Sequence, residues 1–218
     1  MIEVIRSNVE IGHGNVRLPG ELTVPRGCRG AVVFAHGSGS SRLSPRNAEV
    51  ATRFNHGGLA TLLFDLLTPN ESTQRSNVFD IGLLTDRLVA AVGQMQHEPK
   101  IQGGPIGLFG ASTGAAAAID AAALVGEQVR AVVGRGGRPD LASHLEEVRA
   151  PILLVVGGND TEVLDLNREA AQRIGSEHEL EVVEGATHLF EEPGTLRQVA
   201  DLARAWFTRW FAAGQGTP

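Results

Sequence analysis

The sequence predicts an α/β protein in which helices cover both faces of a mostly parallel sheet. Six short apolar runs, rich in β-branched residues, alternate with segments of helical spacing, and this order is typical of βαβ units. Each run is apolar along nearly its whole length, as expected for strands that are buried on both faces of a sheet. The runs lie at residues 31–35, 60–64, 105–109, 130–134, 151–156 and 180–184.

The segments between these runs carry helix start and stop signals. Ser44 and Pro45 predict the N-cap and the first residue of a helix that ends at Gly57 and Gly58. A second helix is predicted by apolar residues at helical spacing, namely Ile81, Leu84, Leu88, Val92 and Met95. Further helices are expected over residues 115–124 and 165–174, followed by a last helix that buries Leu196, Val199, Ala203, Phe207 and Trp210.

The stretch before the first apolar run has a different pattern. Residues 3–25 are predicted to form two or three antiparallel strands, with a hairpin turn near residues 12–15. No linker, repeat or internal domain boundary is visible in the rest of the chain. We therefore expect a single domain over residues 1–218, of which residues 213–218 form a frayed tail.

Composition and charge exclude several classes of function. The net charge is −6 and there is no long basic run, so nucleic acid is not an expected partner. Glu3 and Arg6 interrupt what would be a signal core, and no stretch approaches ~18 consecutive apolar residues, so we expect a cytoplasmic protein that does not contact membranes. Cys28 is the sole cysteine, which rules out an internal disulfide and a CxxC metal site.

The segment GASTG, from Gly110 to Gly114, has the sequence of a nucleophile elbow. Ser112 lies where the strand ending at Phe109 turns into the helix expected from Ala115, which is the context that the G-x-S-x-G motif requires. The flanking glycines let the backbone turn tightly so that the serine hydroxyl is exposed at its tip. The five-residue pattern by itself is a weak signal, because a serine that only caps a helix in a tight turn gives the same sequence.

A serine nucleophile needs a general base and a group that orients this base. The order serine, acid, histidine along the chain is the order found in α/β hydrolases, where each residue follows a strand. Asp160 follows the run 151–156, and His188 follows the run 180–184. This agreement in order and position is much more specific than the elbow motif, and it predicts a catalytic triad of Ser112, Asp160 and His188.

Such a site also needs two backbone N–H groups that stabilise the developing oxyanion. The first is expected from Thr113, the residue after the nucleophile, at a helix N-terminus that also favours an anion. The second is expected from the loop HGSGSS after the first parallel run. Ser38 is the first choice as donor and Gly39 is the alternative.

The segments AVVFAHGSGSS, GLFGASTG, VVGGND and GATHLFEEP together resemble the α/β-hydrolase superfamily, specifically its small dienelactone hydrolase-like branch without a cap domain. This resemblance implies a serine hydrolase that cleaves small carboxylic esters or lactones through an acyl-enzyme and needs no cofactor. Dienelactone hydrolase itself uses a cysteine nucleophile, whereas this elbow holds Ser112. The sequence does not name the substrate, and it leaves a homodimer through the last helix open.

Other residues are candidates for roles at the same edge of the sheet. Asp165 is the rival acid, but it is expected one turn into a helix, and Asp65 is expected to be structural. His36 is expected to brace the HGSGSS loop through hydrogen bonds. Two further residues, Arg135 and Arg138, follow the run 130–134 at the carboxyl edge, where ligands bind, and are candidates to hold a substrate carboxylate. The alternative is that the two arginines only keep the loop soluble, or that Arg138 forms an ion pair with Asp140.

Two other classes compete with the hydrolase interpretation. Gly107, Gly110 and Gly114 are spaced like loose glycines of a dinucleotide-binding turn. In that fold the turn usually follows the first strand, and an acidic residue ends the next one, whereas here two βα units precede the turn and the next run ends at Arg135. The third class is a catalytically silent α/β-hydrolase scaffold that serves as a binding module. Retention of all three triad residues favours the enzyme.

Overall fold

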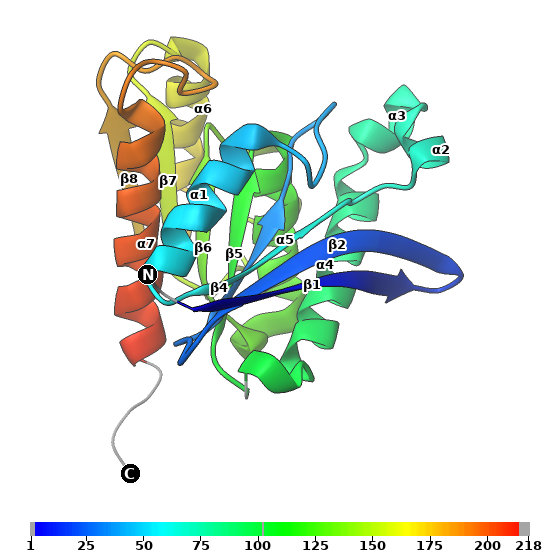
Figure 1. Cartoon of the computed structure of the whole chain (residues 1–218). Coiled ribbons are helices and arrows are strands. Elements are labelled where there is room, and N and C mark those ends of the chain that lie inside the picture. The colour runs from blue at the N-terminus through cyan, green and yellow to red at the C-terminus, as the bar shows by residue number, and fades with distance from the viewer. Residues whose placement is uncertain (1–2, 102, 214–218) are drawn as a thin grey trace.

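Eight strands form one sheet in the computed structural model, which describes residues 3–101 and 103–213. The strands are β1 (Val4–His13), β2 (Val16–Pro25), β3 (Ala31–Ala35), β4 (Ala60–Phe64), β5 (Ile106–Ala111), β6 (Val129–Arg135), β7 (Ile152–Gly157) and β8 (His178–Val183). They lie in the order β1-β2-β4-β3-β5-β6-β7-β8 (Figure 1).

The pairing of the strands confirms the predicted sheet. Strands β3 to β8 correspond to the six apolar runs, and they pair in parallel with one another. β1 and β2 form an antiparallel hairpin, and β2 is antiparallel to β4. Gly14, with a φ of 55°, lies in the hairpin turn, as a tight turn between twisted strands requires. The sheet is therefore mixed, with its antiparallel part confined to the N-terminal edge.

Helices cover both faces of this sheet, as the continuous apolar strands predict. The helices are α1 (Pro45–His56), α2 (Pro69–Ser72), α3 (Arg75–Val78), α4 (Ile81–Gln96), α5 (Thr113–Val125), α6 (Thr161–Ala171) and α7 (Thr195–Ala213). Buried residues of α1 and α7 form the core on one face, and those of α4, α5 and α6 pack on the other (Figure 1). α7 includes Ala213, and residues 214–218 of the expected tail lie outside the described residues.

Two details of the helices differ from the sequence prediction. The helix expected over residues 165–174 begins at Thr161 and ends at Ala171, because Asp160 takes the N-cap position directly after the β7 turn. α2 and α3 were not predicted. The capping box of Thr68 and Glu71, in which each side chain bonds the backbone N–H of the other, starts α2. The four-residue pattern TPNE was the signal that could have identified this helix.

A group of buried aromatic rings fixes the carboxyl ends of β3 and β5. The centroids of Phe34 in β3 and Phe109 in β5 are 4.9 Å apart. Phe54 of α1 packs on both rings, at 5.7 and 5.8 Å. Tilted and edge-on pairs at these distances stabilise a core beyond the area they bury. Because each strand ring lies two or three residues before a loop of the candidate site, this packing sets the positions from which those loops begin.

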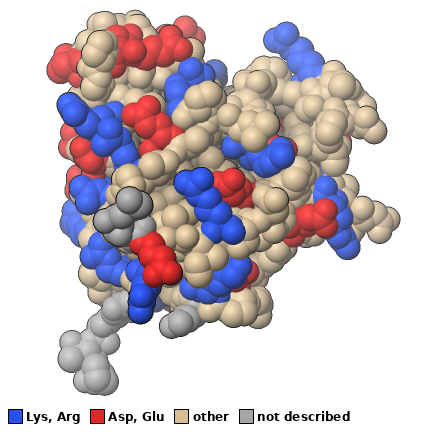
Figure 2. Space-filling view, viewed as in Figure 1, with Lys and Arg blue, Asp and Glu red and all other residues tan. Residues whose placement is uncertain are grey.

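The surface carries charges of both signs. Figure 2 shows basic and acidic side chains interspersed over one face of the molecule. Among the helices of the described residues, none is both long enough and apolar enough to cross a bilayer.

Candidate active site

The turn between β5 and α5 holds Ser112 in an unusual backbone conformation. Its φ is 51° and its ψ is −124°, a region that non-glycine residues rarely occupy and that costs about 1–3 kcal/mol. The two glycines of the motif allow the strand and helix to cross closely. A Cβ on Gly110 would overlap the Cα of Ala115, and a Cβ on Gly114 would overlap the carbonyl oxygen of Ala35. Ser112 therefore occupies the strained elbow that the sequence predicts.

The close crossing at Gly110 predicts a large stability effect. We expect Gly110→Ala to lower the free energy of unfolding by at least about 1–3 kcal/mol, because the added methyl group meets backbone atoms that cannot move aside. Gly93→Ala is the matched control, since Gly93 lies within α4 and its Cβ would have no neighbour within 4 Å. The free energy of unfolding of that variant should be higher than that of the wild type by about 0.5–1 kcal/mol. Denaturant unfolding measures the stability of both variants. Equal changes in the two would show that the contact of Gly110 with the α5 backbone does not limit the residue at this position.

Asp160 and His188 form a hydrogen-bonded pair at the same edge of the sheet. The distance from His188 Nδ1 to Asp160 Oδ2 is 2.7 Å, and 15% of the Asp160 side chain is exposed. Backbone bonds from Gly158 N to Val183 O and from Asn159 N to Ala186 O, both 2.9 Å, join the two loops. These bonds fix the two loops relative to each other, so the positions of the carboxylate and the imidazole are set by the ends of β7 and β8.

The imidazole of His188 lies beside the backbone next to the serine turn. A Cβ on Gly136 would be 3.5 Å from both Cε1 and Nδ1 of His188. The preceding residue, Arg135, accepts a hydrogen bond from Ser112 N at 3.1 Å through its carbonyl oxygen. Within residues 3–101 and 103–213, no hydrogen bond joins the Ser112 hydroxyl to His188. Catalytic hydrogen bonds are often long without substrate and shorten when it binds.

The loop after β3 packs directly on the serine turn. A Cβ on Gly37 would be 3.0 Å from Ser112 Cβ, so this glycine permits the close approach. Ser38 N donates to Thr113 Oγ1 at 3.0 Å. The two residues expected to supply oxyanion donors are thus adjacent, but the amide of Ser38 is engaged by the threonine hydroxyl. Gly39, with a φ of 69°, follows in the turn and is open around its Cα.

His36 braces this loop, as the sequence predicts. Its Nδ1 donates to the carbonyl oxygen of Gly37 at 3.1 Å, and its Nε2 accepts from Leu66 N, also at 3.1 Å. This arrangement requires a neutral ring. Burial lowers the pKa of His36 below its ordinary value. Asp65 is also structural, because its carboxylate accepts from Arg42 N at 2.7 Å and from Arg42 Nη1 at 2.6 Å.

The buried neutral His36 predicts a pH dependence of stability. The unfolded chain binds a proton at this residue below pH ~6.5, whereas in the folded protein the lowered pKa of His36 keeps the ring neutral to a lower pH. The free energy of unfolding should therefore fall as the pH decreases below ~6.5, by at most about 1.4 kcal/mol per pH unit from this group. Denaturant unfolding between pH 7.5 and 5.5 should show a shallower decline for His36→Asn. Replacing the exposed His56 in the same way is the control, and identical pH slopes for all three proteins would refute the assignment.

Arg135 and Arg138 occupy different environments. Arg138 makes a two-point ion pair with Asp140, with Nε and Nη2 each 2.8 Å from a carboxylate oxygen, which is the alternative considered from the sequence. Arg135 is 7% exposed, and its Nη1 has no hydrogen-bond partner among the described residues. Burial and then the charge of Arg46 lower the pKa of Arg135 to about 10. It therefore remains charged at neutral pH.

A pocket of about 430 Å³ opens beside the Ser38 loop. It is lined by residues 36–43 and by Asp65, Leu67, Pro69, Ser72, Val78 and Leu84. The sequence indicates that loops near residues 66–77 line the substrate site, but it does not predict their path. Within the part of the chain that the structure describes, no group of three or more histidine, cysteine or acidic side chains could hold a metal ion.

Comparison with known proteins decides the family. A model described as the dienelactone hydrolase family matches residues 29–213. The chain belongs to this family. A dienelactone hydrolase from Anabaena variabilis ATCC 29413 is 50% identical, with a TM-score of 0.91 over 95% of this chain and 98% of that one. A Xanthomonas campestris protein described as a member of the α/β serine hydrolases without a lid has a TM-score of 0.77 at 17% identity, over 98% of this chain and 97% of that one. This dienelactone hydrolase family member therefore has the lidless α/β-hydrolase fold.

Two curated relatives from strains of Mycobacterium tuberculosis carry a different name. Each is 58% identical over 200 residues, and the names assign both provisionally to the phosphoribosyl transferases. The match covers 91% of this family member but 45% of each relative. The chain thus spans about half the length of these proteins.

Proposed function

We propose that the protein is a serine hydrolase that cleaves small carboxylic esters or lactones. The observation that carries this proposal is the 2.7 Å pair of Asp160 and His188 at the edge of the sheet where the strained Ser112 turn lies. A carboxylate bonded to Nδ1 holds the imidazole with Nε2 free to accept a proton. A serine on a strained turn next to such a base is the arrangement that acyl transfer requires.

In the proposed reaction His188 Nε2 takes the proton of Ser112 as the hydroxyl oxygen attacks the carbonyl carbon. The charge that develops on the carbonyl oxygen is stabilised by the N–H of Thr113, which as the first residue of α5 has no partner within the helix. A second donor comes from the loop after β3. The Ser38 amide serves if it turns from the Thr113 hydroxyl to the substrate, and Gly39 is the alternative.

The remaining steps use the same groups in reverse. The tetrahedral intermediate expels the alcohol, which takes its proton from the imidazolium of His188, and the acyl group stays on Ser112. Water then attacks this acyl-enzyme with His188 as base, and the acid leaves as the serine regains its proton. Asp160 stays ionised throughout and stabilises the imidazolium. Neither Arg135, which is buried, nor Arg138, which is paired, takes part in this mechanism.

The competing interpretations have less support. A nucleotide-binding turn gains nothing from a serine at a φ of 51° or from the Asp160–His188 pair, and β6 ends in Arg135 rather than in an acidic residue that would bond a ribose. The transferase name belongs to relatives about twice as long as the matched segment, so it does not favour transfer chemistry for this chain. A silent scaffold would have no need of a preserved acid–histidine pair.

A fluorophosphonate probe tests the proposal directly. The phosphorus is attacked by an activated serine hydroxyl with loss of fluoride, so intact-protein mass spectrometry should show one adduct, and peptide mapping should locate it on Ser112. Titration with NAD(P) in the same samples should give no saturable binding. A protein that binds the dinucleotide and remains unlabelled would instead support the nucleotide-binding alternative.

A further inference from the structure

The 430 Å³ pocket lies on one side of the serine turn, and His188 lies on the other. Gly37, which lines the pocket, is the residue whose Cβ would touch Ser112 Cβ at 3.0 Å. The other lining residues belong to the loop after β3, to the segment from the end of β4 through α2 and α3, and to the first turn of α4. In the sheet, β5 separates β3 and β4 from β6, β7 and β8, and His188 follows β8. The pocket and the histidine therefore flank the serine from opposite sides.

This placement distinguishes the two halves of an ester. The proposed mechanism requires His188 to protonate the departing alcohol oxygen, so the alcohol leaves from the side of β7 and β8. The acyl group then extends the other way, across Gly37 and Ser38. The pocket beside these residues is the space that receives it, and its volume is within the range of small-molecule sites.

The residues that line the pocket carry no net charge. Leu67, Val78 and Leu84 supply apolar surface from three successive segments of the chain. The charged side chains among the lining residues are Arg42 and Asp65, and these neutralise each other at 2.6 Å. A carboxylate placed here would find no unpaired cation among the lining residues, and the serine hydroxyls of the loop would replace only part of its hydration.

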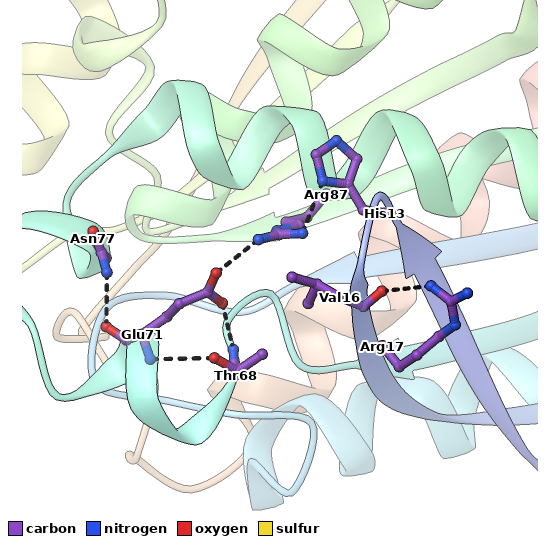
Figure 3. A network of polar contacts seen from close by, with 7 residues as sticks. All are labelled: His13, Val16, Arg17, Thr68, Glu71, Asn77 and Arg87. Carbon is purple, nitrogen blue, oxygen red and sulfur yellow. Dashed lines mark hydrogen bonds and ion pairs between the residues drawn. The ribbon is translucent and has the colours of Figure 1, made fainter.

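The wall formed by α2 and α3 is held by one ion pair, between the buried Arg87 and the half-buried Glu71. Glu71 caps α2 at Thr68, and its other carboxylate oxygen accepts from Arg87 Nη2 of α4 at 2.8 Å (Figure 3). The Arg87 side chain is 4% exposed and bonds His13 Nδ1 at 2.8 Å, and Asn77 Nδ2 donates to Glu71 O at 3.2 Å. The network joins both short helices to α4 and to the N-terminal hairpin, so this wall is fixed before substrate arrives.

We propose that this pocket is the acyl site of the hydrolase, that it selects uncharged, apolar acyl groups larger than acetyl, and that Val78 in α3 sets their size. This inference rests on the proposed serine hydrolase function. Glu71 is a positioning residue, because it acts on the substrate through the wall that it holds. Because Asp65 neutralises Arg42, the pocket discriminates against acyl groups that carry a carboxylate.

The test compares p-nitrophenyl esters that differ only in the acyl group. Butyrate should exceed acetate in kcat/KM by about tenfold, the gain expected from burying two further CH₂ groups. The hemisuccinate should fall below butyrate by a similar factor. Val78→Phe fills the pocket, so the butyrate-to-acetate ratio should drop to about 2 or less, while Val78→Ala should move the best substrate of an acetate-to-octanoate series toward longer chains.

Control variants distinguish a failure of the acyl-site inference from a failure of the hydrolase proposal. Val125→Phe makes the same change at a half-buried site at the far end of α5 and should keep the wild-type ratio. Glu71→Gln should raise KM for butyrate more than for acetate. A labelled Ser112 with acetate turnover, but with an unchanged ratio in Val78→Phe or a preference for the hemisuccinate, would overturn the acyl site alone. Failure to label Ser112 and to hydrolyse any ester would refute the hydrolase proposal.

A second series varies the alcohol at constant acetyl group. Phenyl, ethyl and hexyl acetates should be ranked alike by the wild type and by Val78→Phe, because the alcohol lies on the other side of the serine. A change confined to the alcohol series would place the leaving group in the pocket and so contradict the acyl assignment.

Discussion

Ser112→Ala is expected to lower kcat for p-nitrophenyl butyrate by about 10⁴-fold or more. Alanine keeps the shape of the turn but removes the oxygen that forms the acyl-enzyme, so His188 has no nucleophile to activate. The remaining rate over water comes from binding and oxyanion stabilisation alone. Steady-state kinetics measures the loss, and pre-steady-state measurements should show that the burst of p-nitrophenol seen with the wild type disappears.

The control for this experiment is Ser143→Ala, which removes a hydroxyl from an exposed serine away from the turn. That variant should retain wild-type rates. Circular dichroism and unfolding curves should be unchanged in both variants, because alanine retains the Cβ of Ser112 and with it the backbone strain of the turn. Wild-type turnover by Ser112→Ala would exclude this residue as the nucleophile.

Asp160→Asn is expected to lower kcat by about 10⁴-fold with little change in fold. The asparagine amide can donate to Nδ1, which places the imidazole proton on Nε2 and prevents that nitrogen from accepting the serine proton. It also removes the negative charge that stabilises the imidazolium. The side chain that makes this 2.7 Å contact is mostly buried, so water does not replace the carboxylate easily.

The matched control is Asp165→Asn, which alters the rival acid. Asp165 lies within α6, and its carboxylate is exposed and pairs with Arg168 at 3.0 Å. Surface pairs of this kind contribute about 0–1 kcal/mol to stability, so rates and unfolding should remain close to wild type. A large loss in Asp165→Asn together with normal activity of Asp160→Asn would reverse the assignment of the acid.

Much of the site could be predicted because its residues occupy local positions defined by strand ends. Asp160 and His188 each follow an apolar run, and parallel strands bring their carboxyl ends to one edge, so the pair was predicted without any coordinates. The elbow was equally local, since Gly110 and Gly114 flank Ser112 within five residues. His36 and Asp65 were predicted to be structural for the same reason, and the hydrogen bonds of both confirm it.

Other features depend on contacts between distant segments, and here prediction failed or gave alternatives. The helix after Asp160 began four residues earlier than its apolar pattern indicated, because the β7 turn determines where it starts. α2 and α3 were missed, since a pair of four-residue helices has too little periodicity to be recognised. Arg135 and Arg138 looked alike in sequence, yet Arg138 is paired with Asp140 and Arg135 is buried beside Arg46.

The amino-acid sequence by itself determined the sheet, the order of its strands along the chain and the three residues of the proposed triad. Hydrophobic periodicity and glycine spacing act over a few residues, so they can be read from short segments. Tertiary structure alone decided that the Ser38 amide meets Thr113, that Glu71 and Arg87 hold the pocket wall, and that the pocket opens opposite His188. These contacts join residues tens of positions apart, and their geometry follows from how whole elements pack.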